Sequence, residues 1–276
     1  MRQTATATTL PTNREAEFMN KLPLITAAFW VMKITATTLG ETGGDWASMT
    51  MDLGYLLSTA IFFGIFLVAL TTQLCTRRHI PFLYWTVIIA TSTAGTTMSD
   101  YMDRSLELGY TKGASILVTI LVVILILWRI TTGSLSVTNV KDRKGEVFYW
   151  LAILASNTLG TASGDFLSDD SGIGFLGSWL LVSGLLAIVM LLFHFTKISR
   201  VLLFWLAFIL TRPFGATFGD VLTKSHAKGG LDLGRGWSSL TLLAILVVAI
   251  LISYRKTGST VVESTDPADR LSYSNA

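Results

Sequence analysis

The chain has 276 residues, of which 51% are hydrophobic and only 14% are charged. An ordinary soluble domain carries about 25% charged residues, so this composition excludes a soluble globular protein and indicates a membrane protein with several spans. A single cysteine, Cys75, excludes an internal disulfide framework. Residues 1–21 contain no continuous apolar run of the kind that a cleavable signal has, so we expect a polar N-terminal tail there.

Eight apolar runs follow this tail, and each is near the roughly 20 residues that a helix needs to cross a hydrocarbon core. They cover residues 24–39, 53–74, 80–98, 114–130, 147–163, 175–195, 201–218 and 237–254. The prediction is an all-α membrane protein with eight transmembrane helices. The membrane domain would span residues 22–254, and a polar C-terminal tail would follow at 255–276.

A short motif occurs four times and divides the chain into repeats. It has the form Gly-x-x-x-Gly/Ser-Asp, and a tryptophan precedes each aspartate by fifteen residues. The aspartates are Asp45, Asp100, Asp165 and Asp220, so their spacings are 55, 65 and 55 residues. Such periodicity predicts four parallel two-helix repeats, at residues 22–76, 77–131, 146–196 and 197–254. The longer central spacing suggests a duplicated four-helix unit, with a two-fold relation better than the four-fold one.

The distribution of lysine and arginine predicts the orientation of these repeats. Most of them lie in the segments on the amino-terminal side of each repeat, and only five lie on the motif side: Arg104, Lys112, Lys224, Lys228 and Arg235. By the positive-inside rule both termini are cytoplasmic and the motifs lie near the outer surface. Most acidic residues lie on that outer side, where they would concentrate cations. Alternatively, acids simply collect where bases are excluded.

The motif side chains suggest an oxygen-rich site. Positions four and seven residues before each aspartate share its helical face, and in three repeats they are polar. Carboxylates and hydroxyls suit protons or hard cations. The candidate ion-binding or proton-carrying residues are therefore Glu41, Asp45, Asp100, Asp165, Asp220, Thr38, Thr93 and Thr158. Of these, Glu41, Asp45, Asp100 and Asp165 are the candidate metal ligands. The motif glycines are more simply explained as helix-packing contacts, although they also permit local unwinding.

Two cations interrupt the apolar runs, Lys33 and Arg212. A buried cation without a partner is very unfavourable, so we expect both to pair with motif carboxylates, with Arg212 pairing with Asp220. Arg212-Pro213 also predicts a break or kink, because proline removes a backbone hydrogen bond. The four repeat tryptophans fit either anchors at the membrane interface or wedges that pack between helices, and the anchor interpretation is the default.

These motifs resemble a bacterial family of integral membrane proteins that are built of four tandem two-helix repeats of unknown function. The resemblance covers approximately residues 24–254 and rests on the tryptophan and on Thr-Leu-Gly-Glu-Thr-Gly-Gly-Asp in the first repeat. It implies eight spans and a location in the bacterial inner membrane. The fourth repeat departs from the pattern at Arg212-Pro213, and the resemblance supplies no substrate.

Two functions fit these observations. The first is a secondary transporter or exporter of a small cation, such as a divalent metal, coupled to protons. The second is a membrane scaffold or sensor that transports nothing, in which the motif is a structural turn. We do not expect an enzyme or a cofactor beyond a bound cation. The expected partners are the lipid bilayer and the cation, with no nucleic acid, and the sequence leaves a monomer or a homo-oligomer open.

Overall fold

The computed structural model describes residues 25–76, 80–135, 137 and 143–263, and it describes side chains through residue 254. Within these residues the chain is helical and contains no strand. The long helices are α2 (Ala27–Asp45), α3 (Gly54–Cys75), α4 (Pro81–Asp100), α5 (Tyr110–Thr132), α6 (Arg143–Asp165), α7 (Gly174–Phe195), α8 (Arg200–Thr223) and α9 (Arg235–Glu263). Each predicted apolar run falls largely on one of them. Helix α9 continues past the expected end at Tyr254 into the segment predicted to be a polar tail.

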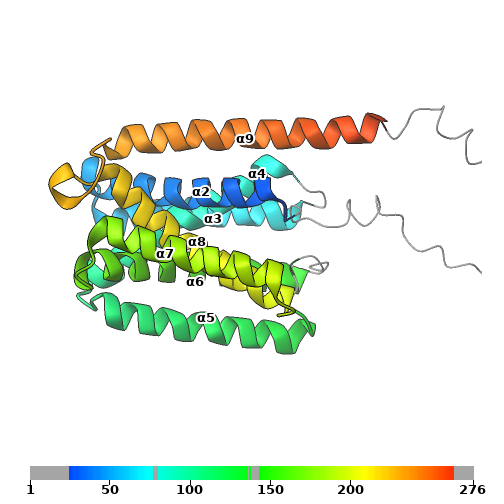
Figure 1. Cartoon of the computed structure of the whole chain (residues 1–276), viewed down its shortest axis with the longest axis horizontal. Helices are drawn as coiled ribbons and strands as arrows, with labels where there is room; N and C mark the ends of the chain where they lie inside the picture. Colours follow the sequence, from blue (N-terminus) through cyan, green and yellow to red (C-terminus); the bar gives the residue numbers. More distant parts are fainter. Residues whose placement is uncertain (1–24, 77–79, 136, 138–142, 264–276) are drawn as a thin grey trace, which may run out of the picture.

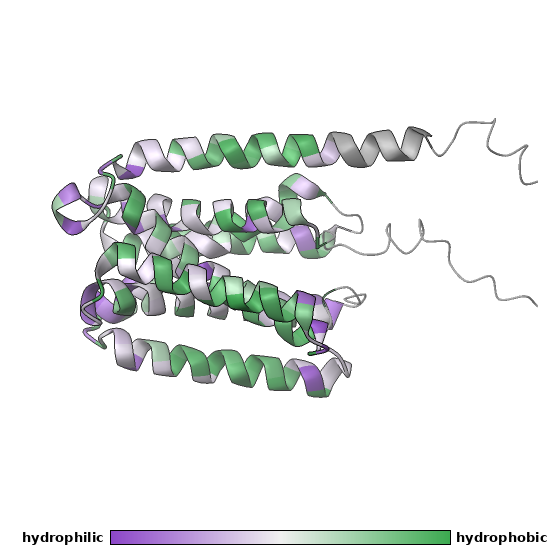
Figure 2. Cartoon of the chain, viewed as in Figure 1, coloured by the Kyte–Doolittle hydropathy of each residue, from purple (hydrophilic) through white to green (hydrophobic). Residues whose placement is uncertain are grey.

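Among the described residues, five helices are long and apolar enough to cross a membrane: α3, α5, α7, α8 and the part of α9 that ends at Tyr254. Apolar residues run along α5, α7 and α9, and hydrophilic residues gather near the helix ends (Figure 2). This pattern is that of a membrane protein. Helices α2, α4 and α6 contain the threonines, serines and glycines of the motifs, which lower their hydropathy.

The long helices form an inner ring and an outer ring around it. Helices α2, α4, α6 and α8 contact one another in sequence, and α8 returns to α2, so they close an inner ring. Each remaining helix packs on the inner helix of the next repeat: α3 on α4, α5 on α6, α7 on α8 and α9 on α2. Helices α5 and α9 lie at opposite edges of the view in Figure 1. These contacts do not separate the repeats into two pairs, because the same neighbours recur at all four positions.

The buried share of each helix follows the same division between inner and outer helices. Only 17 or 22% of the apolar segment is buried in α3, α5, α7 and α9, against 50% in α8 of the inner ring. The outer helices therefore present most of their apolar side chains away from the protein, as helices that face lipid do. The inner helices turn their polar residues toward one another.

A recurring turn connects the inner and outer helices at the motif end. Three motifs are followed by one turn of π-helix: η1 (Trp46–Thr50), η2 (Tyr101–Ser105) and η4 (Phe166–Asp170). The fourth repeat instead has a short 3₁₀ helix, η5 (His226–Lys228). A glycine with positive φ then starts each outer helix, as Gly54 (φ 73°) does for α3. Three acids of the predicted outer mouth, Asp52, Glu107 and Asp232, also have positive φ in these turns.

The repeat tryptophans pack between neighbouring helices, so the prediction of interfacial anchors is wrong. Trp85, Trp150 and Trp205 are buried. Each repeat tryptophan contacts an aromatic side chain of another helix, which is an inner helix in three cases and the outer helix α5 in the case of Trp205. The pairs and their centroid distances are Phe29–Trp85 at 5.8 Å, Tyr84–Trp150 at 5.6 Å, Phe204–Trp30 at 5.8 Å and Trp128–Trp205 at 5.6 Å.

Candidate functional site

The first glycine of each motif lets two inner helices approach closely. A Cβ atom at Gly40 would lie 2.4 Å from the Ser92 Oγ, and one at Gly215 would lie 2.5 Å from the Thr37 Oγ1. Gly95 meets Asn157 and Gly160 meets Arg212 in the same way. The helices remain regular through the motifs. The packing explanation of the glycines is therefore correct, and the backbone is not unwound there.

Arg212 lies where the four inner helices meet, and its side chain is fully buried. Each of its three nitrogens donates a hydrogen bond of 3.1 Å to a main-chain carbonyl of a different helix. Nε donates to Asn157 of α6, Nη1 to Thr37 of α2 and Nη2 to Ser92 of α4. The three acceptors occupy the position that Arg212 itself occupies in the fourth repeat, eight residues before the motif aspartate. Pro213 lies inside α8, which continues as one helix from Arg200 to Thr223, so of the predicted break or kink the break is absent.

Glu41 is the charged partner of Arg212. Its Oε2 lies 3.3 Å from the Arg212 Nη1, and it accepts hydrogen bonds from the hydroxyls of Thr96 (3.1 Å) and Thr161 (3.4 Å). Both hydroxyls also accept hydrogen bonds from the Arg212 Nη2. The predicted pairing of Arg212 with Asp220 is therefore wrong, because Arg212 reaches across the ring to the first repeat. We call Arg212, Glu41, Thr96 and Thr161 the central layer.

The four motif aspartates lie one helical turn farther toward the motif end, and each has a basic partner. Arg104 bridges Asp100 and Asp165, at 3.2 Å from each. The other pairs are Arg235–Asp45 at 3.4 Å and Lys224–Asp220 at 3.1 Å. We call these seven residues the outer layer. Their carboxylates are nearly buried, whereas the exposed fractions of the basic side chains are 28%, 29% and 18%.

The partners at the motif end were missed in the sequence. Arg104 and Lys224 each follow a motif aspartate by four residues, which is the spacing of a helical ion pair and could have identified them. Arg235 comes from the last outer helix, and no local spacing connects it to Asp45. Burial would lower the pKa of the Lys224 ammonium, but the Asp220 and Asp45 carboxylates outweigh burial and raise that pKa above its usual value.

Lys33 does not pair with a carboxylate, contrary to the prediction. Its side chain is fully buried, and its Nζ lacks a hydrogen-bond partner among the described residues. The Nζ lies 4.0 Å from the centroid of the Phe208 ring. Lys33 lies two helical turns before Glu41 on α2, so it cannot reach the motif carboxylates, and the ring face of Phe208 contacts the ammonium instead.

The predicted threonines at the position seven residues before the aspartate lie outside the central layer. Each donates its hydroxyl hydrogen bond to its own helix: Thr38 to the Ile34 carbonyl at 2.9 Å, Thr93 to Ile89 at 3.0 Å and Thr158 to Leu154 at 3.0 Å. The site uses the positions eight and four residues before the aspartate, because the glycine contacts turn position eight toward the ring centre. The prediction that the threonines seven residues before the aspartate belong to the site is therefore wrong by one position.

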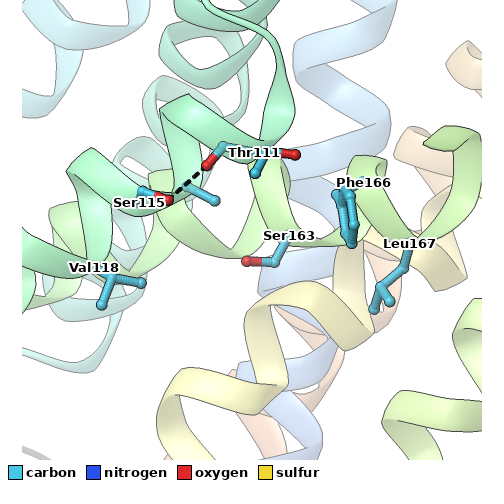
Figure 3. Close-up of a pocket in the computed structure, with 7 residues that line it drawn as sticks. Thr111, Ser115, Val118, Ser163, Phe166 and Leu167 are labelled. Atoms are coloured by element: carbon cyan, nitrogen blue, oxygen red, sulfur yellow. Dashed lines mark hydrogen bonds between the residues drawn. The ribbon is translucent and has the colours of Figure 1, made fainter. Parts of the chain in front are cut away.

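The candidate metal ligands do not form a metal site. Among the described residues, no group of three or more His, Cys, Asp or Glu side chains could hold a metal ion. Glu41 pairs with Arg212, Asp45 pairs with Arg235, and Asp100 and Asp165 share Arg104. A groove elsewhere lies between α5 and the end of α6 (Figure 3), where Thr111, Ser115 and Val118 face Ser163, Phe166 and Leu167. It lies away from the central layer.

The fold and its polar centre define a helical membrane protein of tandem two-helix repeats that close into a ring. The chain belongs to the family described as Repeat of Unknown Function (DUF347), whose model matches it four times, at residues 28–79, 83–134, 148–199 and 203–259. This result confirms the four-repeat family that the sequence resembles. No curated protein and no solved structure matches the chain.

Proposed function

We propose that this protein is a secondary transporter of a small cation in the bacterial inner membrane, and that Glu41 is its central exchangeable carboxylate. The observation that carries the proposal is the position of Glu41: a buried carboxylate at the centre of a closed ring of helices, one turn below a layer of four aspartates. Ionisable groups inside a membrane are energetically costly and usually functional.

The ligand chemistry favours a proton or a monovalent cation. The central and outer layers offer carboxylate and hydroxyl oxygens, which suit hard cations. The described residues contain no group of three or more His, Cys, Asp or Glu side chains that could hold a metal ion, and a divalent ion needs more carboxylate charge than the single Glu41 offers, so the proposal does not retain the divalent metal. Protonation of Glu41 would release its attraction for Arg212, and a cation entering through the outer layer would have the same effect. Exchange of a proton for a cation at Glu41 would couple the movement of protons to the movement of the cation.

The proposed topology places all eight long helices across the membrane. Helices α2, α4 and α6 have 19, 20 and 23 residues, which is about the length needed to span the hydrocarbon core. They can be more polar than a lone span because the outer helices surround them. The lysine and arginine asymmetry favours cytoplasmic termini and an outward motif end. The spacing of 55, 65 and 55 residues favours descent from a duplicated four-helix unit.

A scaffold or sensor is the second candidate, and one observation favours it. Each motif carboxylate already has a basic partner, and Arg212 fills the ring centre. Such a network would hold a rigid ring together without any transported ion.

Flux measurements separate the two candidates. The purified chain would be reconstituted in liposomes, and the decay of an imposed pH gradient would be followed on addition of sodium, potassium or lithium. We expect one of these ions to accelerate the decay in the wild type and not in Glu41→Gln, which keeps the shape of the side chain but removes its charge. Asp169→Asn, on the exposed rim, is the matched control and should behave as the wild type. Equal rates in wild type, Glu41→Gln and empty liposomes would favour the scaffold.

A further inference from the structure

Six oxygen acceptors surround the guanidinium group of Arg212, and the first three repeats supply all of them. We call this set the oxygen cage. It consists of the main-chain carbonyls of Thr37, Ser92 and Asn157, the hydroxyls of Thr96 and Thr161, and the carboxylate of Glu41. The fourth repeat contributes none of these oxygens and supplies the cation instead.

The geometry of the cage matches a planar cation with three nitrogens. Each guanidinium nitrogen of Arg212 has its own carbonyl acceptor at 3.1 Å, from three different helices. A guanidinium group has five N–H donors in a fixed plane, whereas an ammonium is a compact charge. The cage oxygens lie beyond the nitrogens, so they enclose a wider space than the shell of a bare metal ion such as Ca²⁺, whose ligands lie at about 2.3–2.6 Å.

The main chain supplies three of the six cage oxygens, so half of the cage is fixed by how the helices pack. The close contacts of Gly40 with Ser92, and of Gly215 with Thr37, bring the helices together at the level of the carbonyls. The first three repeats have a small uncharged residue at the position that corresponds to Arg212. These residues are Thr37, Ser92 and Asn157. The ring therefore accommodates residues without charge at this level.

We propose that the oxygen cage is a binding site for guanidinium-type cations and that Arg212 occupies it as a tethered ligand. The inference rests on the proposed function in that it takes the ring centre as the cation site. It adds what holds the centre of that site: the cage recognises the planar cation of Arg212, and the exchangeable ion of the proposed function approaches Glu41 from the outer layer. When Arg212 is replaced by a short residue, a free guanidinium ion takes its place beside Glu41.

The test empties the cage by replacing Arg212 and Pro213 of the fourth repeat with the corresponding residues of the third repeat. The double variant Arg212→Asn, Pro213→Thr copies Asn157-Thr158, and the full chain would be purified in detergent. Its melting temperature would be measured against guanidinium chloride in the millimolar range, with sodium, potassium and tetramethylammonium chloride at equal concentration as controls. We expect a saturable rise with guanidinium alone, because binding to the folded state raises apparent stability. The wild type, whose cage is filled, should show no such rise.

Glu41 provides a second, independent readout. Adding Glu41→Gln to the double variant removes the charge-assisted contact, so the guanidinium concentration for half-maximal stabilisation should increase by about tenfold or more. Saturable stabilisation by sodium or potassium instead would identify a metal-ion cage and overturn the proposal. A similar rise in the wild type, or no rise in the variant, would also overturn it.

A folding failure is also informative. If the double variant is not recovered folded, Arg212→Ser with Pro213→Thr copies Ser92-Thr93 of the second repeat and is prepared with guanidinium present throughout. Absence of folded protein from both variants under these conditions would show that a free cation cannot replace the tethered one. Liposome flux of the wild type tests transport separately, so failure of this inference is distinguishable from failure of the proposed function.

Discussion

The central and outer layers derive from the same motif, one helical turn apart, yet they hold their charges differently. In the central layer Arg212 and Glu41 form a single pair whose side chains are 0% and 5% exposed. In the outer layer the basic partners are 18 to 29% exposed, and Arg104 serves two carboxylates. When one member of a charge pair that water cannot reach is removed, the other has no substitute partner. In the outer layer the basic side chains reach water, so water or a neighbouring charge can replace a lost partner. The central layer should therefore be the more sensitive to substitution.

The largest expected effect is that of Arg212→Ala. It leaves Glu41 buried without its cation and removes one donor from each of three main-chain carbonyls, so we expect a loss of about 3–5 kcal/mol in folding stability. Folded yield and melting temperature in detergent measure it. Arg235→Ala, which removes a partner of Asp45 whose side chain is 29% exposed, is the matched control and should lose less than Arg212→Ala. Equal losses in the two variants would contradict the distinction between the layers.

Glu41 then tests whether the unpaired charge causes that loss. Combining Arg212→Ala with Glu41→Gln should recover part of the folded yield, because no isolated charge remains at the ring centre. A double variant as unstable as the sum of the two single variants would assign the effect to packing instead.

The next largest effect comes from the glycine contacts that position both layers. Gly40→Ala would place a Cβ atom 2.4 Å from the Ser92 Oγ and 2.9 Å from its main-chain carbon, so the helices must separate. We expect a loss of about 1–3 kcal/mol, as for other overpacked sites. Gly184→Ala in α7 meets open space and should raise helix stability by up to about 1 kcal/mol. If both variants melt alike, the close approach at Gly40 is not what holds the ring.

The sequence predicted the repeats, the helices and the polar motif, because these depend on local periodicity and composition. It did not predict which residues meet across the ring. Arg212 and Glu41 lie in the last and first repeats, and their contact depends on α8 returning to α2, which no local pattern reveals. A similar limit explains the error at Thr38. Positions seven and eight before the aspartate are adjacent on the helix, and only the Gly215–Thr37 contact determines which one faces inward.

Substitution of Lys33 should change folding stability less than Gly40→Ala does, and it should raise stability instead of lowering it. Lys33→Met keeps the length of the side chain and removes a buried charge without a hydrogen-bond partner, so we expect stability to rise by about 1 kcal/mol or more. Ile88→Met, at the equivalent buried position of α4, is the control and should lose less than about 1.5 kcal/mol. The melting temperatures of the two variants decide the matter. A destabilised Lys33→Met would mean that the ammonium has a stabilising role that its contact with Phe208 does not explain.

The smallest effect, and the sharpest test of an adaptable outer layer, is the coupling between Asp100 and Asp165. Arg104 lies 3.2 Å from each, so Asp100→Asn or Asp165→Asn alone leaves Arg104 one carboxylate at short range. Each single variant should therefore lose about 1 kcal/mol or less, because Arg104 keeps a charged partner and part of its side chain reaches water. In the double variant the one ion-pair partner of Arg104 that remains among the described residues is Asp169, at 3.9 Å. The combined loss should exceed the sum of the single losses by about 0.5–1 kcal/mol, which is within the range for residues of one network. Melting temperatures of the wild type, both single variants and the double variant complete this cycle. Additive losses would mean that the two carboxylates act independently, and the outer layer would then be a set of separate pairs rather than a network.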